Sequence, residues 1–178
     1  MELVRSMWNL IPDRFRSSNK FMDKLFEHLK LREGYKQSVY LDVVGKQTCG
    51  IGHLLSKEEK EKYPVKSLVP KNVIDEWFEK DVKTALDSAS KQMRLLELDD
   101  EDFKIALVSV NYQLGTSWHR KFPATWHLLK CKYYDDAIKE LLYKNPPDEE
   151  PSTWKEQTPV RVKDFVEAIE LLKEKKNG

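Results

Sequence analysis

The chain has 178 residues, 40% of them hydrophobic and 34% charged, and its 31 basic and 30 acidic side chains give a formal net charge of +1. This length predicts one compact domain with room for two lobes. The balance of charge disfavours a nucleic-acid-binding role, because such proteins usually carry a basic face. No apolar run is long enough for a transmembrane helix, so we expect no membrane insertion.

The segment 1–20 lacks the long apolar stretch and the small-residue cleavage site of a secretory signal. We therefore expect the protein to be made and held in the cytoplasm as a monomer. Cys49 and Cys131 are too few for a disulfide framework, and a reducing compartment favours free thiols. The spacing of cysteine, histidine and aspartate suggests no metal site, and we expect no cofactor.

The first predicted helix covers residues 18–32, where apolar side chains recur at helical spacing and Gly34 can end the helix in a left-handed conformation. Glu33 would then lie in the last turn. Two short runs rich in β-branched and aromatic residues follow at 38–41 and 47–51, with a turn near Gly45. This pattern predicts a hairpin or a small three-stranded sheet.

The remainder of the chain is predicted to be helical. A long helix is expected over residues 71–93, and shorter helices over 102–114, 123–131, 135–143 and 159–173. Three prolines between residues 145 and 153 predict a loop there. The last eight residues are rich in lysine, and we expect them to fray. The fold class is therefore α+β and predominantly helical.

Two carboxylates and a hydroxyl lie in one glycine-rich segment, residues 31–53, and we interpret them as the groups that split a glycosidic bond. That reaction needs a carboxylic acid to protonate the leaving oxygen and a second carboxylate on the opposite side. Glu33 is the better acid, because the negative end of a helix dipole favours its neutral form. Asp42 should stay ionised, and the Thr48 hydroxyl can hold a water beside it. Taken alone, the spacing of Glu33 and Asp42 favours solvated surface charges, as most carboxylates are.

Three ordered blocks of sequence resemble the lysozymes, or endolysins, of T-even bacteriophages. The first runs from Phe26 to Leu54 and contains the two carboxylates, the threonine and the glycines. The second is residues 106–115, and the third is the motif Trp-x-x-Gln-Thr-Pro-x-Arg at residues 154–161. The resemblance implies an extension over residues 1–20 and a catalytic domain over 21–178. In that domain a β-containing lobe of about 34–70 is joined by the helix 71–93 to a helical lobe of about 94–174, which also includes the helix 19–33.

The resemblance also assigns supporting residues. It implies that Arg161 approaches Glu33 and holds it in place, although an exposed helical arginine is an alternative. The other assignments are a hydrogen-bonded wall beneath Glu33 formed by Gln113 and Trp154, and saccharide contacts from Leu54, Tyr112 and Thr125.

His53 has two possible roles. It can be interpreted as a general base, but we favour a structural ion pair with Asp81 in the long helix.

The implied function is a peptidoglycan muramidase that cleaves the β-1,4 bond between N-acetylmuramic acid and N-acetylglucosamine. A water shared by Asp42 and Thr48 implies direct displacement with inversion. The enzyme would wait in the host cytoplasm until a membrane lesion releases it to the wall. Two alternatives remain at this point: a virion-associated module that penetrates or binds the wall, and a chitinase-like glycosidase acting on another polymer of N-acetylglucosamine. The segment 54–70 is shorter than the family pattern, which could alter substrate reach.

Overall fold

The computed structural model describes residues 19–146 and 149–177, so the predicted extension over residues 1–20 lies almost entirely outside the described residues. The chain divides into two compact units, one ending at Asp81 and one beginning at Val82. This boundary falls inside a single helix, α4 (Lys71–Leu95). We describe each unit by itself.

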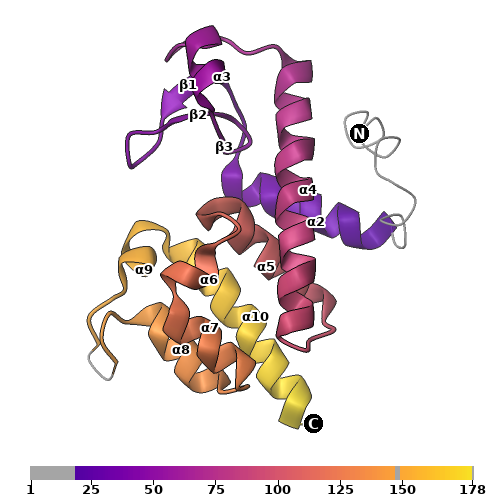
Figure 1. The fold of residues 1–178 in the computed structure, drawn as a ribbon, viewed down its shortest axis with the longest axis vertical. Coiled ribbons are helices and arrows are strands. Elements are labelled where there is room, and N and C mark those ends of the chain that lie inside the picture. The colour runs from indigo at the N-terminus through magenta and orange to yellow at the C-terminus, as the bar shows by residue number, and fades with distance from the viewer. Residues whose placement is uncertain (1–18, 147–148, 178) are drawn as a thin grey trace. The chain divides into compact units, whose positions relative to one another are not determined.

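The first unit contains α2 (Asn19–Glu33), a sheet, α3 (Lys57–Lys62) and the first part of α4 (Figure 1). The sheet has strands β1 (Lys36–Leu41), β2 (Gln47–Gly50) and β3 (His53–Leu54), paired antiparallel in the order β1-β2-β3. The predicted α+β fold with a small sheet near the N-terminus is thus confirmed.

The sheet is packed on α4 through a small apolar core. The face that carries Val39 and Cys49 contacts Ile74 and Trp77 of the helix. Gly50 has a φ of +65°, and a Cβ atom there would lie only 2.5 Å from Cγ2 of Ile74. A glycine at this position therefore lets the strand approach the helix closely, and burial of these apolar side chains stabilises the contact.

Helix α2 also packs against α4 within this unit. The rings of Phe26 and Phe78 lie 5.7 Å apart, and Leu25 and Leu29 are completely buried. These positions follow the helical spacing of the apolar residues, which places them on one face of α2. This contact accounts for the place of α2 in the unit that contains the sheet.

The second unit contains the rest of α4 and six further helices in the described residues (Figure 1). Helix α5 (Glu101–Leu114) lies at its core and contacts α10 (Pro159–Asn177), which also contacts α8 (Tyr134–Leu142). The other three are α6 (Trp118–Lys121), α7 (Pro123–Lys130) and α9 (Thr153–Gln157). A buried polar cluster joins α4 to α5 and α6: Gln92 accepts hydrogen bonds from Asn111 (2.7 Å) and from the Trp118 indole (3.1 Å).

The C-terminal end corrects one prediction. The residues expected to fray are helical as far as Asn177, because α10 continues to that position. Two of its lysines are anchored: Lys173 contacts Asp135 at 2.6 Å, and Lys175 contacts Asp100. These aspartates are distant in sequence, so a lysine-rich composition alone could not indicate them.

Two other observations concern expectations from the sequence. Cys49 and Cys131 are both free thiols, the first buried and the second exposed. Among the residues that the structure describes, no helix combines the length and the apolar character that crossing a membrane requires.

Candidate active site

Glu33 is the last residue of α2, and its position is set by two glycines. Gly34 has a φ of +68°, and its N–H donates to the Lys30 carbonyl at 3.0 Å, which ends the helix. The carboxylate of Glu33 lies directly against Gly52, where an added Cβ would be 2.7 Å from Oε2. Any other residue at position 52 would overlap this carboxylate, so the turn between β2 and β3 provides its space.

Asp42 follows β1 directly and is held by the backbone of the hairpin turn. Its Oδ1 atom accepts hydrogen bonds from the N–H groups of Val44 (3.0 Å) and Lys46 (2.8 Å). Its own N–H donates to the Lys46 carbonyl at 2.9 Å. Among the described residues, no hydrogen bond occupies Oδ2 of Asp42. The side chain is therefore fixed through one oxygen, and the other is available to a ligand.

Thr48 lies in the middle of the sheet with only 5% of its surface exposed. Its hydroxyl donates a hydrogen bond to the Lys46 carbonyl at 3.2 Å. The proton of Thr48 is thus used within the protein, and its oxygen keeps lone pairs that can accept from a bound molecule. Tyr40 on β1 and Leu54 on β3 lie opposite Thr48, and Leu54 is 49% exposed.

Tyr40 is influenced electrostatically by both carboxylates. Its pKa is raised, first by burial and then by the negative charges of Glu33 and Asp42. In the sheet, Tyr40 is opposite Thr48, and it precedes Asp42 by two residues. All three predicted catalytic side chains therefore belong to the first unit, around Tyr40, although their chemical roles stay predictions.

His53 is held between two carboxylates. Its Nδ1 lies 2.6 Å from Oδ2 of Asp81, the predicted partner, and its Nε2 lies 3.0 Å from Oε2 of Glu59. Its ring also stacks on Trp77 at 4.4 Å between centroids. Burial lowers the pKa of His53, but the hydrogen bonds and charges of Asp81 and Glu59 outweigh it and raise the pKa above the ordinary value. With both ring nitrogens engaged, a structural role fits His53 better than that of a general base.

The sequence analysis did not identify Glu59, although a signal for it exists. Ser56 and Glu59 form a capping box at the start of α3, in which Glu59 accepts from the Ser56 N–H at 2.7 Å. The S-x-x-E pattern predicts this helix start, but it does not predict that the same carboxylate reaches His53.

The supporting residues predicted in the second unit form their own contacts. The Trp154 indole donates to Oε1 of Gln113 at 3.3 Å, so these two side chains are hydrogen-bonded as expected. Arg161 donates to the Ser109 hydroxyl at 2.6 Å and is only 8% exposed, which contradicts the alternative of an exposed arginine. That Arg161 holds Glu33, and that Gln113 and Trp154 lie beneath it, stay predictions.

The two other residues assigned to saccharide binding lie on helices of the second unit. Tyr112 is half-buried on α5, whereas Thr125 on α7 is 2% exposed. The Leu54 side chain in the first unit is thus the most exposed of the three. Saccharide contacts of all three stay predictions.

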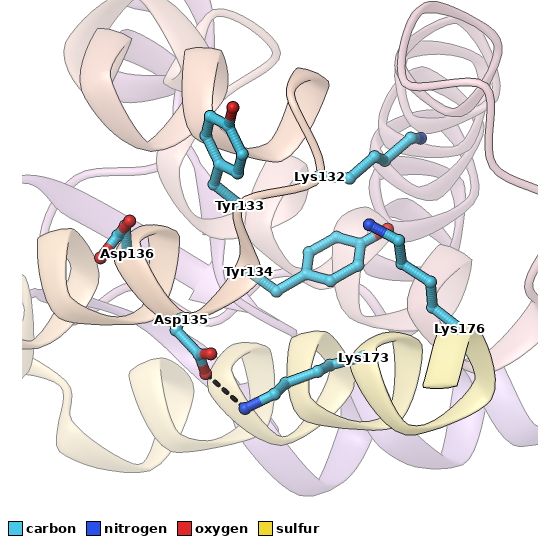
Figure 2. A pocket seen from close by; sticks show the side chains of 7 residues that line it. All are labelled: Lys132, Tyr133, Tyr134, Asp135, Asp136, Lys173 and Lys176. Carbon is cyan, nitrogen blue, oxygen red and sulfur yellow. Dashed lines mark hydrogen bonds and ion pairs between the residues drawn. The ribbon is translucent and has the colours of Figure 1, made fainter. Parts of the chain in front are cut away.

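A pocket of about 280 Å³ in the second unit has a different character. Its charged groups bind one another or cap a helix: Lys173 contacts Asp135 (Figure 2), and Lys132 donates to the carbonyl of Leu96 just beyond the end of α4. Lys176 lies over the ring of Tyr134, 5.8 Å from its centroid. The other lining carboxylate, Asp136, pairs with Lys139 at 3.1 Å, so both acidic groups are neutralised and the pocket is a poor candidate for acid–base chemistry.

Comparison with known proteins identifies the chemistry. The family described as phage lysozyme matches residues 30–146, a range that includes Glu33, Asp42 and Thr48. This chain belongs to the phage lysozyme family. It is 30% identical to a Dictyostelium discoideum protein named probable T4-type lysozyme 2, over 87% of this chain and 99% of the relative. It is also 31% identical to probable T4-type lysozyme 1 of that organism, over 80% of this chain and 91% of the relative. The protein is therefore a glycoside hydrolase of the lysozyme type.

Proposed function

We propose that this lysozyme-type peptidoglycan hydrolase is a muramidase that cleaves the β-1,4 bond between N-acetylmuramic acid and N-acetylglucosamine with inversion. The observation that carries the proposal is the arrangement around Tyr40. Glu33 is placed against a glycine, Asp42 has one oxygen available, and the oxygen of Thr48 can accept a hydrogen bond. Family membership supports peptidoglycan as the substrate.

Glu33 is the general acid in this proposal. It lies at the C-terminal end of α2, where the negative end of the helix dipole favours the protonated carboxyl group. Half-burial acts in the same direction, since it disfavours the charged form. The proton of Glu33 passes to the glycosidic oxygen as the bond to the leaving sugar breaks.

Asp42 and Thr48 activate the attacking water. Because the Thr48 hydroxyl donates its hydrogen bond to the Lys46 carbonyl, its oxygen accepts a hydrogen bond from the water. Oδ2 of Asp42 accepts a second hydrogen bond from the water, while Oδ1 stays bound to the backbone. The water then directs a lone pair at the anomeric carbon, and its departing proton is taken by Asp42. In an inverting site this water needs the two carboxyl groups about 6.5–9.5 Å apart.

The bond that is cleaved can be identified by mass spectrometry of the products from purified peptidoglycan. Reduction with borohydride marks each new reducing end, and a muramidase is expected to mark N-acetylmuramic acid. Marked N-acetylglucosamine would show a glucosaminidase, and a polymer of N-acetylglucosamine cleaved in preference to peptidoglycan would favour the chitinase-like alternative.

The stereochemistry is tested by proton nuclear magnetic resonance during early turnover. We expect the α-anomer of the new reducing end to appear first from the β-linked substrate. An early β-anomer, or a sugar trapped covalently on Asp42, would overturn the inverting mechanism and leave the muramidase assignment in place.

We also propose that the enzyme acts as a monomer on the bacterial wall after release from the host cytoplasm. Fractionation of producing cells before and after membrane permeabilisation tests this order of events. Enzyme found outside the membrane before any permeabilisation would contradict it.

A further inference from the structure

Tyr40 occupies a position in the sheet that the proposed mechanism does not yet use. Its Cα lies opposite that of Thr48 on β2, and Thr48 in turn lies opposite Leu54 on β3. Residues directly opposite one another in antiparallel strands point to the same face of the sheet. Tyr40 therefore shares a face with the threonine that holds the water and with an exposed leucine.

The Tyr40 phenol is influenced electrostatically by both proposed catalytic carboxylates. Its pKa is raised by burial and then by the charges of Glu33 and Asp42, so its hydroxyl stays protonated at neutral pH and remains a hydrogen-bond donor. Within the described residues this hydroxyl has no hydrogen-bond partner. Tyr40 is half-buried, so its hydroxyl keeps its hydrogen for a bound molecule.

Lys36 forms a cation–π contact with the Tyr40 ring. The Lys36 ammonium lies 4.6 Å from the centroid of the Tyr40 ring, and it forms no ion pair with any other described residue. A cation on the ring face is attracted by the π electrons and draws density from them. This contact favours one orientation of the ring and strengthens the O–H as a donor.

We propose that Tyr40 is a substrate-binding residue, whose hydroxyl donates a hydrogen bond to an oxygen of the saccharide bound between Glu33 and Asp42. Lys36 acts through the ring as a positioning residue. The inference rests on the proposed function. Sugars offer hydroxyl and acetamido oxygens as acceptors, and a neutral donor can approach two carboxylates without neutralising either of them. A lysine or arginine there would pair with the acid and the base instead.

Steady-state hydrolysis by the full chain of soluble peptidoglycan fragments tests this proposal. Tyr40→Phe keeps the ring and its packing but removes the donor. Loss of one neutral hydrogen bond is expected to lower kcat/KM about threefold to tenfold. The matched control is Tyr35→Phe, because Tyr35 is exposed and its raised pKa reflects burial and Asp75 rather than the catalytic pair. Both variants should keep the wild-type melting temperature. Tyr35→Phe should also keep the wild-type kcat/KM.

A second measurement reports on binding without turnover. Tyrosine labelled with ¹³C at Cζ gives one signal per ring, assigned with Tyr40→Phe, and we expect the Tyr40 signal to move when tri-N-acetylchitotriose is added. The Tyr35 signal should not move. This measurement uses the wild-type chain, so it decides the question even if Tyr40→Phe does not fold.

The outcomes separate the two proposals. A wild-type chain that releases no muropeptides would overturn the proposed function. An active wild type, together with unchanged kcat/KM in Tyr40→Phe or an unmoved Tyr40 signal, would overturn only the role of Tyr40. Lys36→Gln is expected to lower kcat/KM when it is introduced into the wild-type chain. Introduced into the Tyr40→Phe variant, it should have no further effect. Additive losses would remove Lys36 from its positioning role.

Discussion

The carboxylate of Glu33 and the backbone of Gly52 approach so closely that residue 52 decides where the acid lies. An alanine there would place its Cβ 2.7 Å from Oε2 and 3.0 Å from Cδ of Glu33. We expect Gly52→Ala to displace the carboxyl group and to lower kcat about a hundredfold, because a displacement of about 1 Å has effects of that size. Steady-state kinetics on purified peptidoglycan measures this loss.

Gly115→Ala is the matched control for the Gly52 prediction. Both glycines have positive φ, +71° for Gly52 and +88° for Gly115, but nothing beyond the neighbouring residues lies within 4 Å of a Cβ added at Gly115. The two variants share the backbone strain, which costs about 1–2 kcal/mol for a left-handed alanine. A comparable loss of kcat in both would show that strain, rather than overlap with Glu33, explains the effect.

The role of Glu33 itself is tested by an isosteric change. Glu33→Gln keeps the shape of the side chain but cannot deliver a proton, so activity should fall by about 10²–10⁴-fold, the usual contribution of general acid catalysis. Glu27→Gln is the control, since Glu27 is an exposed residue of the same helix. Near-normal turnover by Glu33→Gln, measured as release of muropeptides, would remove Glu33 from this role.

At the scale of elements, His53 joins β3 to α3 and α4 through a charge-dependent contact. The raised pKa of His53 means that its contribution is full below the ordinary value of 6.5 and is lost as pH rises through the folded value. Burial raises the pKa of Glu59, but hydrogen bonds from Ser56 and His53 outweigh it and lower the pKa. Its contribution is therefore present above the ordinary value of 4.5 and lost as pH falls through the folded value. The contact is strongest between these limits.

We therefore expect Glu59→Gln to lower the melting temperature most in mildly acidic solution, and to lower the pKa of His53 measured by nuclear magnetic resonance. Above the folded pKa of His53, the difference from wild type should shrink. Glu61→Gln, an exposed change in the same helix, is the control. A difference that is independent of pH, or an unchanged His53 pKa, would argue against the ion pair.

The helices that could be predicted are those whose signals, apolar periodicity and a glycine at the helix end, lie within the segment itself. Helices α2, α4, α5, α7, α8 and α10 are long enough to show apolar periodicity, and Gly34 gives the end of α2. Helices α3, α6 and α9 have six, four and five residues, too few for a period to be visible. The end of α10 depends on contacts of Lys173 and Lys175 with distant aspartates.

The same distinction applies to the site. Glu33, Asp42 and Thr48 could be proposed from one short segment, because residue types, glycines and a helix end all lie within it. The approach of Gly52 to Glu33 and the contact of Glu59 with His53 depend on how the chain folds back. Sequence spacing does not determine such distances, so these two contacts required the structure.

At the scale of the molecule, the three proposed catalytic residues belong to one unit, while Gln113, Trp154 and Arg161 belong to the other. The match to the phage lysozyme family begins at residue 30. We therefore expect a chain shortened to begin at Asn19 to keep the kcat/KM of the full chain on peptidoglycan. A shortened chain with normal circular dichroism and no activity would show that the segment before Asn19 contributes to the site.

Because His53 stacks on Trp77, the fluorescence of Trp77 should report on His53. An excited indole transfers an electron more readily to a charged imidazole than to a neutral one, and these rings are 4.4 Å apart and inclined by 17°. Trp77 emission should therefore be dim while His53 is protonated and brighten as the proton leaves. The difference in fluorescence between wild type and Trp77→Phe would then follow the charge state of His53 in real time, without any label.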